Sequence, residues 1–358
     1  MTGRLLLYGA TGYTGRRIAP ALVRAGVEVT LAGRDEAAVR RVAEPLGLPW
    51  VAIDLADAEG LDAALRGATA VLHAAGPFAQ TAAPMLAACL RTGVHYLDLG
   101  GEWPVFAQLM ARDAEARAMG IMVMPGVGLT IVATDCLLAL AKQRHPDTVK
   151  FRLGISKAQV VSRGSVATAA TLLAAGAVVR RAGALVSVPA GSLTRAFDFG
   201  AGLREATAMS WADVVTGEFS TGIGDIEVYS ELRTGQRLSN RASGMAMSVT
   251  GSTVWRAAGR AAAAAWPQAP AEDARAAAQF VMVAEAIDPW RRSRFLRMRT
   301  GDGYGVSVAT ATAATQRVLM GEAAPGFQTP SKVFGPEFIL GLGSAAVLEG
   351  SASTTAAA

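Results

Sequence analysis

The hydrophobic pattern at the start of the chain predicts a strand, a glycine-rich turn and a helix. Four apolar residues run from Leu5 to Tyr8, as in a strand that is buried on both faces of a parallel sheet. Glycines follow at positions 9, 12 and 15, and the apolar spacing of a helix extends from Arg16 to Arg24. Such a turn brings backbone N–H groups close to a pyrophosphate, whose charge the helix N-terminus favours. A tight turn in another kind of α/β protein remains the alternative for the glycines alone.

The alternation of strand and helix continues for about 145 residues. The further predicted strands are Val27 to Leu31, Trp50 to Ile53, Ala70 to Ala74, Val94 to Leu97 and Ile121 to Met124, and the predicted helices cover 36–45, 60–66, Thr81 to Thr92, Pro104 to Met119 and 130–144. Six strands with helical crossovers predict an α/β fold, a Rossmann doubly wound parallel sheet. Ligands of such sheets bind at the carboxyl ends of the strands, so we expect the loops at 9–15, 33–35, 75–78, 98–102 and 125–128 to share one cleft.

The pattern changes after His145, where strands become more frequent than helices. We expect strands at Val149 to Ile155, Thr194 to Phe199, Ala206 to Phe219 (in one or two pieces) and Asp225 to Leu232, with a helix from Ser165 to Arg181. This grouping predicts a largely antiparallel sheet with one helix against it, a second α+β domain. Ser252 to Ile287 resembles two helices broken at Pro267 to Pro270, whose apolar faces would serve as core, dimer contact or substrate pocket.

The end of the chain returns to helical and extended patterns. Tyr304 to Leu319 is expected to be a helix capped by Gly321, and Gly326 to Ser331 an extended segment fixed by Pro330. The tail from Ser351 to Ala358 is small and polar, and we expect it to be frayed.

The composition indicates a globular protein and argues against nucleic-acid binding. Of 358 residues, 51% are hydrophobic and 18% are charged, which is enough apolar sequence for two cores. The sequence pI is about 9.5, but the basic residues are scattered among acids and no arginine–aromatic platform is present.

The cysteines and histidines suggest neither a disulfide nor a metal site. Cys89 and Cys136 lie far apart in apolar helical patterns, as buried thiols of a reducing compartment do. His73, His95 and His145 lack metal-ligand spacing. We expect no signal peptide and no membrane span, and therefore a cytoplasmic protein.

The end of the second strand predicts NADP(H) as the cofactor. NAD-preferring sites usually place an acid there for the ribose 2′-hydroxyl, whereas this chain has Gly33 and then Arg34, and a guanidinium suits a 2′-phosphate. Asp35 leaves NAD open, and a solvated loop charge is the alternative for Arg34. Asp54 and Leu55 lie beside the adenine in this fold, although Asp54 is equally suited to a helix N-cap.

Several linked motifs resemble the saccharopine dehydrogenase-like oxidoreductases, a family that includes saccharopine reductases and trans-acting enoyl reductases. They are Gly9-Ala-Thr-Gly-Tyr-Thr-Gly15, Ala75-Gly-Pro-Phe78, Gly93-Val-His-Tyr-Leu-Asp-Leu-Gly-Gly-Glu102, Pro125-Gly-Val-Gly128 with Thr134-Asp135-Cys136, and Gly326-Phe-Gln-Thr-Pro-Ser331. The resemblance covers most of the chain and is weak over 235–300.

The resemblance implies an NADP(H)-binding Rossmann domain, an inserted α+β domain and a C-terminal segment that returns to the first domain. The corresponding ranges are 1–145, 146–303 for substrate binding or oligomerisation, 304–343 for the returning segment and 344–358 for a flexible tail. It implies phosphate contacts from Gly9, Thr11, Gly12, Tyr13 and Thr14, 2′-side contacts from Gly33 and Arg34, and nicotinamide contacts from Gly76, Pro77, Phe78, Gly101 and Glu102. Family members often have Phe-Asp after the Pro-Gly-x-Gly turn, where this chain has Leu129-Thr130.

Three titratable residues near the strand ends are candidates for the catalytic proton donor: Glu102, Tyr96 and Asp135. Each has a structural alternative. Tyr96 has the pattern of a core residue, Glu102 could cap the helix that opens at Pro104, and Asp135 could pair with Arg144 or Lys142. The chain has no Tyr-x-x-x-Lys pair, since Gly100 stands at that spacing from Tyr96, which argues against the usual short-chain dehydrogenase mechanism.

These observations predict an NADPH-dependent oxidoreductase that reduces a C=N, C=C or C=O bond of a small or carrier-bound metabolite. Arg163, Arg195, Arg204 and Arg233 could bind substrate carboxylates, and the apolar second domain equally suits a lipid-like or polyketide-like substrate. A non-catalytic NAD(P)-binding redox sensor or interaction protein is the alternative, and a structural membrane-surface protein is a third. A homodimer is a further expectation.

Overall fold

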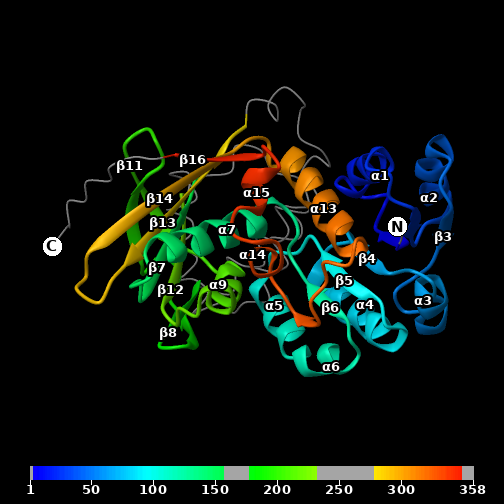
Figure 1. Ribbon diagram of the computed structural model, residues 1–358, viewed down its shortest axis with the longest axis horizontal. Helices are drawn as coiled ribbons and strands as arrows, with labels where there is room; N and C mark the ends of the chain where they lie inside the picture. Colours follow the sequence, from blue (N-terminus) through cyan, green and yellow to red (C-terminus); the bar gives the residue numbers. More distant parts are fainter. Residues whose placement is uncertain (1–2, 157–176, 232–277, 349–358) are drawn as a thin grey trace, which may run out of the picture. The chain divides into compact units, whose positions relative to one another are not determined.

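The computed structural model describes residues 3–156, 177–231 and 278–348, and contacts divide the chain into two units (Figure 1). Unit 1 comprises Met1–Val132 and Tyr304–Phe338, and unit 2 comprises Ala133–Gly303 and Ile339–Ala358. The division falls inside helix α7 (Leu129–Arg144), whereas the sequence predicted a boundary at residue 145.

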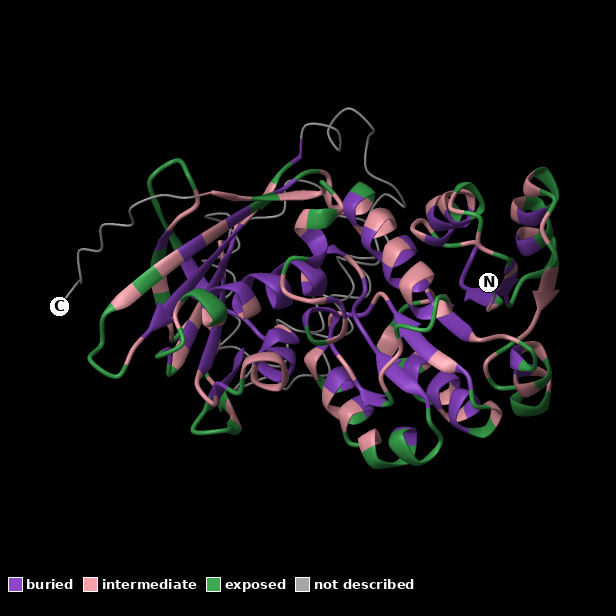
Figure 2. Ribbon diagram, in the orientation of Figure 1, coloured by how far each residue is buried: buried purple, intermediate pink, exposed green. Residues whose placement is uncertain are grey.

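Unit 1 is built on a parallel sheet of seven strands. They are β1 (Leu5–Tyr8), β2 (Val29–Gly33), β3 (Trp50–Ala52), β4 (Ala70–His73), β5 (His95–Asp98), β6 (Met122–Met124) and β15 (Gly326–Phe327). Their order is β15-β6-β5-β4-β1-β2-β3, and each neighbouring pair is parallel. Every residue of β1 and β4 is buried, as the continuous apolar runs require (Figure 2). The predicted doubly wound Rossmann fold is confirmed.

Helices connect these strands, with two differences from the expected bounds. The helices are α1 (Gly15–Arg24), α2 (Glu36–Ala43), the 3-10 turn Glu44–Leu46, α3 (Ala58–Leu65), α4 (Phe78–Thr92), α5 (Trp103–Met110), α6 (Asp113–Ala118), α13 (Gly303–Leu319) and α14 (Pro330–Phe334). The single helix expected over 104–119 is two, because Arg112 leaves the helical region at φ −95°, ψ 12°. Helix α4 begins three residues before the expected Thr81.

The C-terminal segment returns to unit 1, as predicted. Strand β15 pairs with β6 in parallel, with Gly326 opposite Met122. The Asp113 carboxylate accepts a hydrogen bond from the Phe327 amide at 2.7 Å, and the Gln316 side chain donates to the Ala25 carbonyl at 2.9 Å. Residues more than two hundred positions apart therefore share one core.

Unit 2 contains a mixed sheet of nine strands. They are β7 (Lys150–Ile155), β8 (Ala177–Arg181), β9 (Ala184–Val188), β10 (Thr194–Asp198), β11 (Leu203–Ala208), β12 (Ile226–Glu231), β13 (Phe280–Ile287), β14 (Ser293–Thr300) and β16 (Ala345–Leu348). The main order is β10-β11-β12-β7-β13-β14-β16, and β8 pairs with β12 and β9. Among the described strands of unit 2, β12 and β7 form the only parallel pair. The expected largely antiparallel α+β domain is therefore confirmed.

Three elements of unit 2 differ from the sequence prediction. Residues 177–181, expected as the end of a helix, form β8, and residues 280–287, also expected to be helical, form β13. Residues 213–219, expected to be extended, lie in helix α9 (Asp213–Thr221). The remainder of the helices expected over 165–181 and 252–287, Arg163, Arg233 and the tail lie outside the described residues.

None of the helices in the described ranges is both long enough and apolar enough to cross a membrane.

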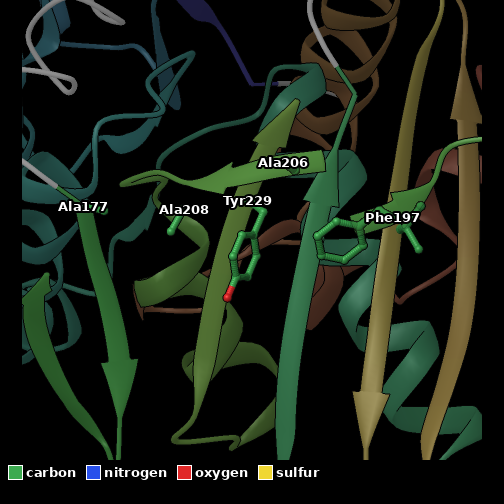
Figure 3. Packing of buried hydrophobic residues seen from close by; sticks show 6 residues of the cluster. Ala177, Phe197, Ala206, Ala208 and Tyr229 are labelled. Carbon is green, nitrogen blue, oxygen red and sulfur yellow. The ribbon is translucent and has the colours of Figure 1, made fainter. Parts of the chain in front are cut away.

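An aromatic and small-residue cluster fills one region of the unit 2 core (Figure 3). Phe197 from β10 and Tyr229 from β12 have ring centroids 5.6 Å apart, and Ala206 and Ala208 of β11 pack beside them. The Phe197 ring also lies against Gly154 of β7, where a Cβ atom would come within 2.6 Å of the ring. The glycine therefore leaves the space that the ring occupies.

Replacing Gly154 with alanine should destabilise the protein by about 2 kcal/mol, because the buried Phe197 ring must be displaced. Urea unfolding of Gly154→Ala measures this loss. Gly301→Ala is the matched control: its Cβ would meet nothing within 4 Å, so its stability should stay within about 0.5 kcal/mol of wild type. Equal losses in the two variants would contradict the packing argument.

Candidate cofactor and active site

The turn after β1 has the tight geometry expected of a phosphate-binding loop. Gly9 has φ +88°, and a Cβ atom there would lie 2.6 Å from the Ala75 backbone nitrogen. A Cβ atom at Gly15 would lie 2.3 Å from the Gly9 carbonyl oxygen. Both positions are therefore restricted to glycine, and the turn leads directly into the N-terminus of α1. The residues present fit a dinucleotide pyrophosphate.

Side chains around this turn hold its shape. The Arg16 side chain donates to the Thr11 carbonyl at 2.7 Å, and Arg17 donates to the Tyr13 carbonyl at 3.2 Å while lying 3.9 Å above the Tyr13 ring. Tyr304, at the start of the returning segment, meets the same ring edge-on at 4.9 Å. No pattern in the sequence indicated that Tyr304 would contact this loop.

The ends of β2 and β3 bring together the residues predicted for the adenosine side. The Ile53 amide donates to the Gly33 carbonyl, and the Tyr8 hydroxyl donates to the Ile53 carbonyl at 3.0 Å. Burial raises the pKa of Tyr8 to about 12; the nearby Asp54 carboxylate adds to this rise and Arg34 opposes it. Arg34 itself is exposed at the strand tip.

The two acids of this region have structural roles. Asp35 is the N-cap of α2 and accepts from the Ala38 amide at 2.9 Å, which leaves Arg34 as the charged side chain at the tip. Asp54 accepts from the Ala56 amide, and the N-cap of α3 is Asp57. The N-cap alternative for Asp54 is therefore wrong, because the helix begins three residues later than that alternative requires.

The loops after β4 and β5 meet at Phe78 and Glu102. A Cβ atom at Gly100 would lie 3.4 Å from the Phe78 ring, and the Glu102 carboxylate accepts from the Ala79 amide at 3.0 Å. Glu102 thus caps α4, whereas its side chain makes no cap bond to α5, which opens at Trp103. Glu102 does occupy the N-cap position of α5, as the capping alternative expected, but without a side-chain cap bond to that helix; its bond to Ala79 stabilises the first turn of α4.

Asp98, which was not among the candidate residues predicted from the sequence, joins the loops after β5 and β6. Its Oδ1 accepts from the amides of Gly100 (2.7 Å) and Gly126 (2.8 Å), and its Oδ2 accepts from the Tyr96 hydroxyl (2.6 Å). The Val127 amide also donates to the Asp98 carbonyl. Burial raises the pKa of Asp98 to about 6; these hydrogen bonds oppose the rise and the Glu102 carboxylate adds to it. Its place at the end of a buried strand, before two glycines, is the signal that could have found it.

Tyr96 and His73 lie below these loops rather than at their surface. Tyr96 is fully buried with its hydroxyl on Asp98, as the core alternative expected, and burial raises its pKa. His73 is fully buried between Tyr8, Phe78 and Tyr96, and burial lowers its pKa to about 3. Neither of its ring nitrogens has a hydrogen-bond partner in the described ranges of the chain. His73 is therefore a neutral ring under the cofactor loops.

The Pro125–Gly128 loop is held by the returning helix α13. Ser307 accepts from the Leu129 amide at 3.0 Å, and the Thr310 hydroxyl donates to the Val127 carbonyl at 2.9 Å. These two residues were not anticipated from the sequence, since they lie almost 180 positions from the loop.

Asp135, the third proton-donor candidate, belongs to unit 2. It is fully buried on α7 and accepts a hydrogen bond from Ser220 of α9. Lys142, one of its suggested partners, donates instead to the carbonyls of Pro146 and Thr148. Burial raises the pKa of the neighbouring Asp213 to about 7; Thr134 opposes the rise and Asp135 adds to it.

No group of three or more potential ligands among the described His, Cys, Asp and Glu residues is arranged to hold a metal ion.

Comparison with known proteins identifies the class of the N-terminal domain. Residues 5–124 match the model of the saccharopine dehydrogenase NADP binding domain, and this match confirms the predicted cofactor class, NADP(H). The trans-acting enoyl reductase of Mycobacterium leprae is 33% identical over 140 residues, which cover 37% of this chain and 33% of that protein. The Mycobacterium bovis trans-acting enoyl reductase is 35% identical over 105 residues, 27% of this chain and 25% of that protein. The matches thus span about a third or less of these relatives.

Solved structures confirm the fold over nearly the whole chain. Saccharopine dehydrogenase (L-Glu forming) from Saccharomyces cerevisiae aligns with a TM-score of 0.62 at 13% identity, covering 97% of this chain and all of that chain. Homospermidine synthase from Legionella pneumophila, solved in complex with NAD, gives 0.62 at 10% identity, with 97% and 92% coverage. At these identities the two solved structures show the shared fold alone.

Proposed function

We propose that the protein is an NADPH-dependent reductase that acts on a C=C, C=N or C=O bond of a small or carrier-bound metabolite. The observation that carries this proposal is the glycine turn that excludes any side chain at Gly9 and Gly15, with Arg34 at the tip of the next strand. Asp35, the acid that could favour NAD, is committed to a helix cap. The geometry therefore supports a cofactor with a 2′-phosphate.

The proposed cofactor contacts follow the strand order. Phosphates would lie against the backbone of the first turn, the 2′-phosphate against Arg34, and the nicotinamide beside the loops after β4 and β5. The residues proposed for these contacts are Gly9, Thr11, Gly12, Tyr13, Thr14, Gly33, Arg34, Asp54, Leu55, Gly76, Pro77, Phe78 and Gly101.

The cofactor, when bound, supplies the hydride, and the chain must position the ring and supply a proton. We propose Glu102 as the residue that moves the proton, because it lies among the loops after β4 and β5 and the residue retains 7% of its surface exposed. Tyr96 holds Asp98 through its hydroxyl and is proposed to act by positioning. Asp135, hydrogen-bonded to Ser220, remains a second candidate for proton transfer.

The name of the mycobacterial relatives favours an enoyl group on a carrier as the substrate. Mixing the purified protein with NADPH and an enoyl thioester on a carrier domain, and following NADPH absorbance, tests this. A sensor would bind NADPH but never oxidise it, and the burial of Tyr96 and the capping role of Glu102 favour that alternative. Absence of NADPH and NADH binding by fluorescence would refute both functions.

Replacing Arg34 with alanine should weaken NADPH binding about tenfold or more and leave NADH binding within about twofold, because only NADPH carries the 2′-phosphate. Fluorescence titration with each nucleotide measures both constants. Arg40→Ala is the control, since this exposed arginine on α2 pairs with Glu44 and should leave both constants unchanged. Equal losses for NADPH and NADH in Arg34→Ala would refute the assignment.

We also propose a cytoplasmic location and a homodimer. Cys89 and Cys136 are free and buried, as expected in a reducing compartment. Light scattering after size exclusion tests the dimer, and a monomer mass would refute it.

A further inference from the structure

Asp98 lies in the half of the sheet that would face the nicotinamide. In a doubly wound sheet the dinucleotide crosses the point where the strand order reverses, here between β1 and β4. The phosphate turn and Arg34 follow β1 and β2, so the adenosine half of the cofactor belongs to that side. The strands β4, β5 and β6 then remain for the nicotinamide half. Asp98 is the last residue of β5, and this placement rests on the proposed function.

The Asp98 carboxylate is a buried negative charge without a cationic partner among the described residues. It is 0% exposed, and its hydrogen bonds come from one hydroxyl and two backbone amides, all neutral donors. None of the arginine, lysine and histidine side chains in the described part of the chain forms an ion pair with it. The charged group that acts on it is Glu102, which is also negative.

Structural carboxylates of this kind are usually paired, because an uncompensated charge in a low-dielectric interior is costly. Two buried glutamates of unit 2 illustrate the contrast. Glu227 has Lys150 at 2.7 Å, and Glu285 is paired with Arg195. Asp98 keeps its charge through hydrogen bonds alone, at the edge where the cofactor loops meet.

A positive charge close to Asp98 would be stabilised more than a neutral group in the same place. The oxidised nicotinamide ring is a cation and the reduced ring is neutral, while both forms share the remaining atoms of the dinucleotide. We propose that the Asp98 carboxylate is a redox-selective positioning residue, which favours binding of NADP+ over NADPH and so makes the bound cofactor a stronger hydride donor.

The residue offers a clean substitution. Both backbone amides bind Oδ1, so asparagine at position 98 keeps an acceptor for Gly100 and Gly126. The Tyr96 hydroxyl, which donates to Oδ2, can instead accept from the asparagine amide. Asp98→Asn therefore removes the charge with little change in shape.

The experiment measures the dissociation constants of NADPH, by nicotinamide fluorescence, and of NADP+, by displacement of NADPH. In Asp98→Asn we expect NADP+ affinity to fall about tenfold relative to NADPH affinity. Asp113→Asn is the matched control: it removes the same charge from a carboxylate of unit 1 that pairs with Arg117 and the Phe327 amide. Its ratio of constants should equal that of wild type.

If Asp98 is purely structural, Asp98→Asn changes both dissociation constants by the same factor and leaves their ratio unchanged. This outcome overturns the proposal. Wild-type protein that binds neither nucleotide would instead refute the proposed function.

If Asp98→Asn does not fold, wild type at pH 5 and pH 8 provides the second measurement. The groups facing Asp98 are Tyr96, His73 and Glu102; the first two stay neutral over this range because burial raises the pKa of Tyr96 and lowers that of His73. Relative NADP+ affinity should fall at pH 5, and a ratio that is constant with pH overturns the proposal.

Discussion

Alanine in place of Gly9 should weaken cofactor binding about a hundredfold and destabilise unit 1 by about 4 kcal/mol. The residue has φ +88°, a conformation that L side chains rarely adopt, and its Cβ atom would lie 2.6 Å from the Ala75 nitrogen and 2.7 Å from the Ala74 carbonyl carbon. Both contacts are backbone, so the ends of β1 and β4 must separate to relieve them. The loss of two amide contacts to a phosphate corresponds to about a hundredfold weaker NADPH binding in the fraction that stays folded.

The control for this variant is Gly93→Ala. Gly93 is the C-cap of α4 with φ +73°, but a Cβ atom there would meet nothing within 4 Å. It should cost about 1 kcal/mol from backbone strain alone and leave NADPH binding unchanged. Urea unfolding and NADPH fluorescence titration compare the two. Similar results for both variants would show that the close approach of the strands does not matter.

The Rossmann unit could be predicted from the sequence because its strands are buried on both faces. Leu5 to Tyr8 and Ala70 to His73 are continuous apolar runs, and glycines or polar residues mark each strand end. The crossover helices have caps close to the expected positions, such as Gly93 after α4. Over this part of the chain, the apolar runs, the helix caps and the short loops all predict the same strands and helices. Such agreement between local signals specifies a fold.

The second unit was predicted less well because its local preferences and its packing disagree. Ala177 to Arg181 continues an alanine-rich stretch, yet it pairs with Ala184 to Val188 across a tight turn at Ala182 and Gly183, both at positive φ. The β-branched residues Val214 and Val215 lie in helix α9, where burial outweighs their preference for strands. Strand β13 has no polar–apolar alternation because its residues from Met282 to Ile287 are buried on both faces of the sheet.

Residues of the candidate site that directly follow a strand could be predicted from the sequence. Residues whose role depends on contacts between loops were predicted less well. The glycines and Arg34 follow their strands directly. Glu102 was selected, but its cap on α4 depends on a contact across 23 residues. Asp98 became evident only when its carboxylate was seen to accept amides from two loops. Sequence spacing does not encode contacts between loops, so the hydrogen bonds of Asp98 and Glu102 could not be predicted from the sequence.

His73 should make the protein sensitive to acid. Burial lowers the pKa of its imidazole to about 3, from about 6.5 in the unfolded chain. Between these values the unfolded state binds a proton that the folded state does not, so stability falls as pH decreases through this window. The expected contribution is about 3 kcal/mol lost between pH 7 and pH 4.

The variant His73→Phe keeps an aromatic ring between Tyr8, Phe78 and Tyr96 but has nothing to protonate. Urea unfolding at pH 4, 5, 6 and 7 should give a smaller loss than wild type by about 3 kcal/mol. The raised pKa of Asp98 acts in the opposite direction, since protonation of a buried carboxyl stabilises the folded state at low pH, but it is common to both proteins and cancels. His145→Asn, which replaces a half-buried ring, should follow the wild-type curve more closely. Parallel curves for wild type and His73→Phe would mean that the imidazole gains a proton without leaving its buried position, and would refute the assignment of acid sensitivity to this ring.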